Sequence, residues 1–229
     1  MNYLELIKER HSVRKYLNKE IEIEKINLIN QKIKEINSIS GLNIQFITNE
    51  PKAYNSNLSH YGKFKNVKNY LIFIGKKTKN FHELCGYYGE QLVLYIQSLG
   101  LNTCWVALTY KKIKSKYNIN KNEKILLSIS VGYGEDNGVF HKSKKITEVS
   151  NVNENSPEWF KNGVEAALLA PTAINQQQFY FRLDENNNVS VKPLIGFYTK
   201  VDLGIVKYHF ELGSGKKLFE NEIISNKII

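Results

Sequence analysis

A basic run near the N-terminus places two arginines and a serine at alternate positions, Arg10, Ser12 and Arg14. A short extended segment would present all three side chains on one side, because side chains alternate across an extended chain. The planar guanidinium of arginine donates two parallel N–H bonds, which match two oxygens of a phosphate. The run therefore predicts an anion-binding segment, and the alternative is the solvated start of a helix.

A second run, residues 170–177, lies in the C-terminal half of the chain. Pro171 ends a preceding helical pattern because proline cannot continue a helix. Thr172, Asn175 and Gln177 follow it, and their hydroxyl and amide groups could hydrogen-bond the polar edge of a planar ring. The alternative is a turn that does no more than end the helix.

In this order the two runs resemble the flavin-binding motifs of the FMN-dependent nitroreductase family. That family has an Arg-Arg-Ser-x-Arg run near the N-terminus and a Pro-Ser-x-x-Asn-x-Gln-Pro-Trp run, usually soon after it. Here residues 20–48 contain no such second run. The layout is therefore similar to the branch in which one chain holds two related halves and mimics the obligate dimer of the other members. The resemblance implies one FMN site per chain, with one motif from each half.

Other segments support the resemblance. Residues 86–105 are similar to the family's central helix and the Gly-Leu-x-x-x-Trp turn after it, residues 127–134 to a later strand, and residues 201–212 to a second copy of the central helix. The implied fold is α+β and nitroreductase-like, with a mixed central sheet flanked by helices and two pseudo-symmetric halves. We place these halves at 1–150 and 151–229, because the most linker-like stretch of the chain lies between them.

The resemblance also implies roles for single residues. The first run and the late lysines Lys142 and Lys144 would hold the FMN phosphate, and the second run would hold the ring. The backbone N–H groups of Ala107 and Leu108, where the family often has glycine, would face N5 and O4 of the ring. Phe179 keeps the aromatic residue that follows the second run, although Gln178-Phe179 replaces Pro-Trp.

Two further positions complete the expected site. Lys65, or its neighbour Lys63, precedes a buried strand and could reach the N1–C2=O edge of the ring, where a cation stabilises negative charge; a surface lysine is the alternative. His11 would position the arginine run. The expected cofactor-binding residues are Arg10, His11, Ser12, Arg14, Lys65, Ala107, Leu108, Lys142, Lys144, Pro171, Thr172, Asn175 and Gln177. No catalytic protein residue is expected, and the histidines show no metal-ligand spacing.

Hydrophobic periodicity predicts the elements that must position these residues. We expect helices over 3–9, 22–36, 84–100, 111–117, 157–169 and 201–212, strands over 43–48, 70–74 and 127–134, and a hairpin around 184–188. Ser156 is expected as the N-cap of the helix over 157–169 and Pro157 as its first residue. His209 lies on an apolar helix face and is expected in the core. Residues 213–229 are expected to form a polar tail or arm.

Composition narrows the function classes. Hydrophobic residues make up 42% of the 229 residues and charged residues 24%, which is ordinary for a globular protein. The net charge of +10 comes from lysine clusters. One interpretation is a surface that binds nucleic acid, but no nucleic-acid-binding motif is visible. We therefore favour solvated basic faces, which would also attract anionic cofactors. We expect no membrane span, no signal peptide, no disulfide between Cys85 and Cys104, and a cytoplasmic location.

The function expected from the resemblance is an FMN-dependent oxidoreductase. It would use NAD(P)H to reduce nitroaromatics, quinones or similar small electrophiles, with the bound flavin supplying the redox chemistry. The alternative is a flavin-binding protein of the same fold with little or no turnover. We expect a monomer without nucleic-acid or membrane partners, although a homodimer through the 213–229 tail stays open.

Overall fold

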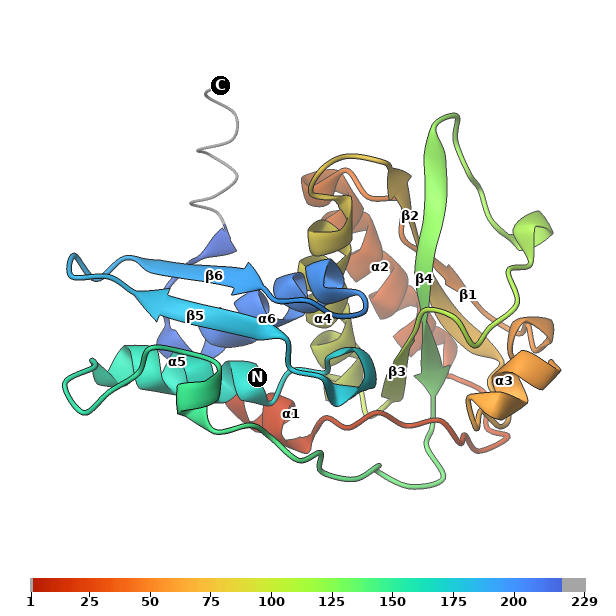
Figure 1. The fold of residues 1–229 in the computed structure, drawn as a ribbon. Helices are drawn as coiled ribbons and strands as arrows, with labels where there is room; N and C mark the ends of the chain where they lie inside the picture. The colour runs from red at the N-terminus through yellow and green to blue at the C-terminus, as the bar shows by residue number, and fades with distance from the viewer. Residues whose placement is uncertain (1, 220–229) are drawn as a thin grey trace. The chain divides into compact units, whose positions relative to one another are not determined.

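The computed structural model describes residues 2–219, which fall into two compact units interleaved along the chain (Figure 1). The sheet unit contains residues 10–81 and 92–140. The hairpin unit contains residues 2–9, 82–91 and 141–219. The predicted division into related halves at residue 150 concerns internal similarity rather than compactness, and it stays a prediction.

The sheet unit is built on four strands in the order β1 (Gln45–Ile47), β2 (Asn69–Lys76), β4 (Glu123–Gly132) and β3 (Asn102–Val106). The three ladders are all antiparallel, so the expected mixed sheet is wrong for these strands. Parallel pairing in this unit is confined, among the described residues, to isolated bridges from Ser12 to Thr103 and from Lys15 to Lys65. The arginine run thus pairs with the sheet unit as a short extended segment and adds no full strand.

Aromatic and aliphatic side chains form the core of the sheet unit. The apolar run Tyr70–Ile74 lies within β2 and is fully buried, as its continuous hydrophobicity predicts. Helix α2 (Ile23–Ser40) buries Ile29, Ile33 and Ile36, which lie three or four residues apart on one face. It ends where Gly41 adopts a left-handed conformation, with φ of 70°.

The short helical segments of the sheet unit are η1 (Lys52–Tyr54), α3 (Asn57–Tyr61) and η2 (Lys114–Lys116). The last of these is shorter than the basic helix expected over 111–117.

The hairpin unit contains, besides part of α4 (Phe81–Ser98), three helices and one β-hairpin among its described residues. They are α1 (Tyr3–Glu9), α5 (Glu158–Leu168), α6 (Thr199–Ser214) and the antiparallel pair β5 (Phe179–Leu183) and β6 (Val189–Pro193), with short η3 (Ile146–Glu148) and η4 (Ala173–Asn175). The hairpin packs against α6 (Figure 1). The expected helix start is one residue early, because Pro157 is the N-cap rather than the first helical residue and Ser156 does not cap α5. The end of α5 before Pro171 and the hairpin around 184–188 are confirmed.

Phenylalanines and glycines bring the elements of the hairpin unit close together. Phe210 of α6 stacks on Phe181 of β5 with ring centroids 4.8 Å apart. A Cβ on Gly163 of α5 would lie 2.5 Å from the Phe210 ring, so only glycine allows this approach. His209 is fully buried, as expected, with Nδ1 3.1 Å from the Ala166 carbonyl oxygen and Nε2 2.9 Å from the Glu90 carboxylate.

Helix α4 (Phe81–Ser98) is shared between the units, since residues 82–91 belong to the hairpin unit and 92–98 to the sheet unit. Within the hairpin unit it meets α6 at two glycines. A Cβ on Gly86 would lie 2.0 Å from the Val201 carbonyl oxygen, and one on Gly204 would lie 2.1 Å from the Glu83 carbonyl oxygen. These glycines therefore set how closely the two helix backbones approach.

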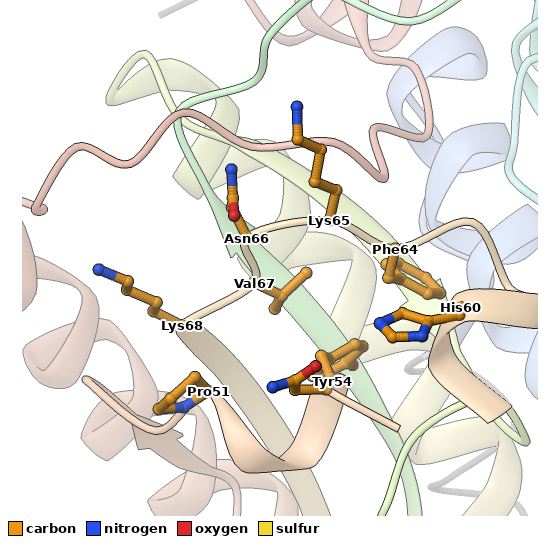
Figure 2. A pocket seen from close by; sticks show the side chains of 9 residues that line it. Pro51, Tyr54, His60, Phe64, Lys65, Asn66, Val67 and Lys68 are labelled. Atoms are coloured by element: carbon orange, nitrogen blue, oxygen red, sulfur yellow. The ribbon is translucent and has the colours of Figure 1, made fainter. Parts of the chain in front are cut away.

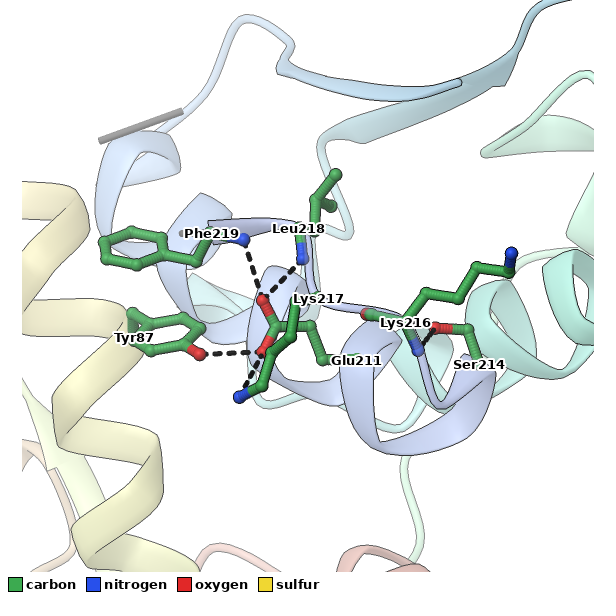
Figure 3. Close-up of polar contacts among 7 residues, drawn as sticks. All are labelled: Tyr87, Glu211, Ser214, Lys216, Lys217, Leu218 and Phe219. Atoms are coloured by element: carbon green, nitrogen blue, oxygen red, sulfur yellow. Dashed lines mark hydrogen bonds and ion pairs between the residues drawn. The ribbon is translucent and has the colours of Figure 1, made fainter. Parts of the chain in front are cut away.

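The first part of the expected tail is packed against its own unit. Figure 3 shows the Glu211 carboxylate accepting hydrogen bonds from the Tyr87 hydroxyl at 2.7 Å and from the backbone N–H groups of Leu218 and Phe219 at 2.9 and 2.8 Å. The Phe219 ring stacks on Tyr87 with centroids 4.0 Å apart. Residues up to 219 are therefore not a free arm, and the rest of the predicted tail lies outside the described residues.

Candidate functional site

Backbone hydrogen bonds fix the arginine run in the sheet unit. The Val13 N–H donates to the Thr103 carbonyl at 3.0 Å, and the Lys65 N–H donates to the Arg14 carbonyl at 3.0 Å. The buried Tyr16 hydroxyl donates to the Val13 carbonyl at 2.7 Å and pairs with the Ser130 hydroxyl at 2.8 Å. The run is thereby held extended, as the alternation of its residues predicts.

The three predicted anion-binding residues share one neighbourhood around the thiol of Cys104. Burial raises the pKa of that thiol, while the charge of Arg14, a hydrogen bond from Ser12 and the charge of Arg10 lower it. Arg10 is buried, whereas Arg14 is exposed. Two guanidiniums and a hydroxyl next to one neutral thiol form a locally positive site that suits a phosphate group.

The other predicted residues of the sheet unit have different surroundings. The Lys65 ammonium forms an ion pair with Glu135 at 2.8 Å. The His11 ring packs edge-on against Phe140 with centroids 4.5 Å apart, which fits a positioning role. Ala107 and Leu108 lie in a bend directly after β3, and the Leu108 side chain is exposed.

Lys65 also lines a pocket of about 340 Å³ within the sheet unit, together with Pro51, Tyr54, Asn55, His60, Phe64, Asn66, Val67 and Lys68. In Figure 2 the rings of Tyr54, His60 and Phe64 gather on one side, and the side chains of Lys65 and Lys68 extend away from them. Lys68 donates to the Asn18 side chain at 2.5 Å. Both ammonium groups thus have protein partners at the rim of this pocket.

The second run forms a strained loop in the hairpin unit. Ile174, Asn175 and Gln177 all have positive φ angles, of 47°, 55° and 47°. Such angles are uncommon for residues other than glycine and are outliers for a β-branched residue such as isoleucine. The Thr172 hydroxyl accepts a hydrogen bond from the Gln177 N–H at 3.0 Å, which closes the loop on itself.

Amide side chains join this loop to the segment that carries the late lysines. The Asn175 amide donates to the Lys142 carbonyl at 2.8 Å. The buried Gln177 side chain accepts from the Lys144 N–H at 2.8 Å, and the Lys144 ammonium donates to the Gln177 carbonyl at 3.0 Å. The structure therefore brings together the predicted ring-binding residues and the predicted lysines 142 and 144 within one unit. The amides of Asn175 and Gln177 hold protein groups here, and their role toward a ring stays a prediction.

On its other side the same loop is held by two residues that sequence reasoning missed, Gln176 and Asp202. The Asp202 carboxylate accepts from the Ala173 N–H at 3.0 and 3.2 Å and from the Gln176 amide at 2.9 Å. Burial raises the pKa of Asp202 to about 6, although the hydrogen bonds from Gln176 and Ala173 lower it. The sequence signal that could have identified Asp202 is its place as the single acidic residue in the apolar helical run Val201–Val206. An acidic side chain is rarely buried without a partner.

The predicted site residues thus form one set in each unit. The sheet unit holds Arg10, His11, Ser12, Arg14, Lys65, Ala107 and Leu108, and the hairpin unit holds Lys142, Lys144, Pro171, Thr172, Asn175 and Gln177. Within residues 2–219 no group of three or more His, Cys, Asp or Glu side chains could hold a metal ion. In the same described part of the chain, no helix has the length and apolar character needed to cross a membrane.

Most of the chain matches proteins of one family. The family described as "Putative TM nitroreductase" matches residues 2–214. A structure of a "putative nitroreductase" from Thermotoga maritima is 25% identical, with a TM-score of 0.60 over 93% of this chain and 83% of that one. A "putative nitroreductase in complex with FMN" from Desulfovibrio desulfuricans is 15% identical, with a TM-score of 0.53 over 69% of this chain and 99% of that one, and supports the fold alone. No curated protein matches the chain.

Proposed function

Since the chain belongs to the nitroreductase family whose profile spans residues 2–214, we propose that it is an FMN-dependent oxidoreductase. In this proposal NAD(P)H is the electron donor, and nitroaromatics, quinones or similar small electrophiles are the acceptors. The observation that carries the proposal is the arginine run, which backbone hydrogen bonds to Thr103 and Lys65 hold extended and whose Arg10, Ser12 and Arg14 all act on the Cys104 thiol. The Desulfovibrio desulfuricans protein of the same fold is described as a complex with FMN.

The arginine run fits the phosphate end of FMN. Phosphate is a dianion with three acceptor oxygens, and the guanidiniums and the Ser12 hydroxyl are donors. The backbone bonds of Val13 and Lys65 hold the run in place before any ligand arrives, so little ordering entropy is lost on binding. Lys142 and Lys144 are proposed to add positive charge toward the same phosphate.

The loop 171–177 is proposed to contact the ring of FMN, with Pro171, Thr172, Asn175 and Gln177 as the residues involved. Its internal hydrogen bonds keep the backbone in one strained conformation, and Asn175 stays exposed. Lys65 and the backbone of Ala107 and Leu108 are proposed as further ring contacts. For Lys65 this requires that its ion pair with Glu135 be shared or broken.

When bound, FMN supplies the hydride and electron transfer, so no protein nucleophile is required. The protein residues bind the cofactor, orient it and tune its charge. A flavin-binding protein with little turnover is the second candidate. The amides of Asn175 and Gln177 already bond protein groups, and this candidate follows if they stay so and leave the flavin without the ring contacts that would tune it for turnover.

The test of the proposal is the visible spectrum of the purified protein, with and without NAD(P)H. A yellow protein whose blue absorbance bleaches with NAD(P)H and returns with a quinone supports the oxidoreductase. A yellow protein that does not bleach supports the second candidate, and a colourless protein that binds no added FMN contradicts both. We further propose a monomer with one FMN, which light scattering and flavin stoichiometry would test.

A further inference from the structure

Gln176 joins two loops of the hairpin unit through both ends of its amide. Its Nε2 donates to the Phe197 carbonyl at 2.5 Å, and its Oε1 accepts from the Phe197 N–H at 3.1 Å. The same Nε2 also donates to Asp202 at 2.9 Å. Since every partner fixes which end of the amide is oxygen and which is nitrogen, the side chain has one orientation only.

The approach of the two loops depends on a glycine. A Cβ on Gly196 would lie 2.4 Å from the Gln176 Oε1, so a larger residue would push the amide out of place. Tyr198, two residues later, takes a left-handed conformation with φ of 53° immediately before α6. Both loops are therefore held in conformations that most residues avoid, and such strain persists only where surrounding contacts impose it.

Asp202 is the common partner of these contacts. It lies in the first turn of α6, it is 3% exposed, and it accepts from the Ala173 backbone and the Gln176 side chain. Hydrogen bonds to a carboxylate are stronger than those between neutral groups. The two loops also carry large apolar side chains that face solvent, Ile174 at 82%, Ile195 at 98% and Phe197 at 70% exposure. Apolar burial therefore does little to hold the loop tips, and the polar contacts must do so.

We propose that Asp202, acting through Gln176, is a positioning residue. It holds the loop 171–177 in place and so sets the geometry in which this loop contacts FMN. We call these contacts of Asp202 with Ala173, Gln176 and, through Gln176, Phe197 the Asp202 latch. Asp202 itself touches no reacting atom in this proposal. The role toward FMN rests on the proposed function, whereas the latch can be measured in the protein without FMN.

The first measurement is hydrogen exchange of the amides of 172–177 in the FMN-free full-length protein. Asp202→Asn replaces one carboxylate oxygen by an amide donor, which in either orientation faces the Ala173 N–H or the Gln176 amide donor, so we expect exchange there to be roughly ten- to hundredfold faster, as for loss of a charge-assisted hydrogen bond. Gln176→Met removes the bridge without altering Asp202 and serves if the first variant folds poorly. Asp184→Asn is the matched control, because Asp184 accepts similar backbone bonds from Asn186 and Asn188 at the hairpin turn. Unchanged exchange in both test variants would overturn the latch.

The second measurement separates a direct contact from general loosening. Asp202→Asn combined with Gln176→Glu exchanges the positions of amide and carboxylate, so exchange should be slower than the two single variants predict together. A strictly additive result would contradict a direct coupling.

The third measurement is the FMN dissociation constant, taken well below the unfolding temperature of each variant. We expect it to rise about tenfold in Asp202→Asn and to stay unchanged in Asp184→Asn, a difference of about 1.4 kcal/mol. Faster exchange with unchanged FMN affinity would overturn the positioning role toward FMN but would support the Asp202 latch. A parent protein that binds no FMN would refute the proposed function, and exchange alone would then decide the latch.

Discussion

The stability of the protein should depend on pH in a way that Asp202→Asn removes. The pKa of Asp202 is raised by burial from the ordinary 3.8 to about 6. The folded state therefore binds a proton more tightly than the unfolded state does. The stabilisation from this proton is complete below about pH 4 and is lost as the pH rises through 6. A rise from 3.8 to about 6 corresponds to about 3 kcal/mol in total, and about half of it falls between pH 5 and 7.5.

The assay is urea unfolding of the parent and of Asp202→Asn at several pH values between 5 and 8. We expect the parent to gain about 1.5 kcal/mol relative to the variant when the pH falls from 7.5 to 5. Glu123 and Asp184, whose pKa values are lowered, act in the opposite direction but are present in both proteins, so the difference cancels them. Parallel stability curves for the two proteins would show that Asp202 titrates normally and would refute the reasoning.

Three further predictions follow from contacts described above. Gly204→Ala should destabilise the protein by roughly 1–3 kcal/mol, because its Cβ would lie 2.1 Å from the Glu83 carbonyl oxygen; an unchanged thermal midpoint would contradict this helix contact. Arg10→Ala should weaken FMN binding by roughly 2–4 kcal/mol in titrations of the apoprotein, since a buried guanidinium paired with the phosphate is lost, and Arg14→Ala, at an exposed position, should weaken it by less; unchanged affinity in both would remove the run from the site. Asn175→Ala should cost about 1 kcal/mol of FMN affinity, and a variant that binds like the parent would leave the loop as a helix-ending turn.

Elements with strong local signals could be predicted from the sequence. Pro157 and Pro171 bracket α5, and the polar stretch 184–188 separates two alternating runs, so the helix and the hairpin appear where expected. The extended form of the arginine run also follows from its own alternation. In these cases the local conformational preference and the tertiary contacts agree.

Features that depend on distant partners could not be predicted. Strand directions in the sheet unit follow from how four segments pair, and the resemblance alone suggested a mixed sheet. The ion pair of Lys65 with Glu135 joins residues seventy positions apart. The Asp202 contacts depend on left-handed residues in the loop 171–177. Asn175 is a residue type that tolerates such angles, but Ile174 gives no such signal, since isoleucine rarely adopts them.

The interleaving of the two units has a consequence for the order of folding during synthesis. The sheet unit has all of its residues once 140 positions have emerged, whereas the hairpin unit needs segments from 2–9, 82–91 and 141–219. Until residues 141–219 are synthesised, the 82–91 part of α4 lacks its partner α6. Its apolar surface then stays exposed and can aggregate or bind chaperones. Contacts between such distant segments also slow folding, because long loops must close first. Shortened chains that end before α6 should therefore retain a folded sheet unit and be poorly soluble.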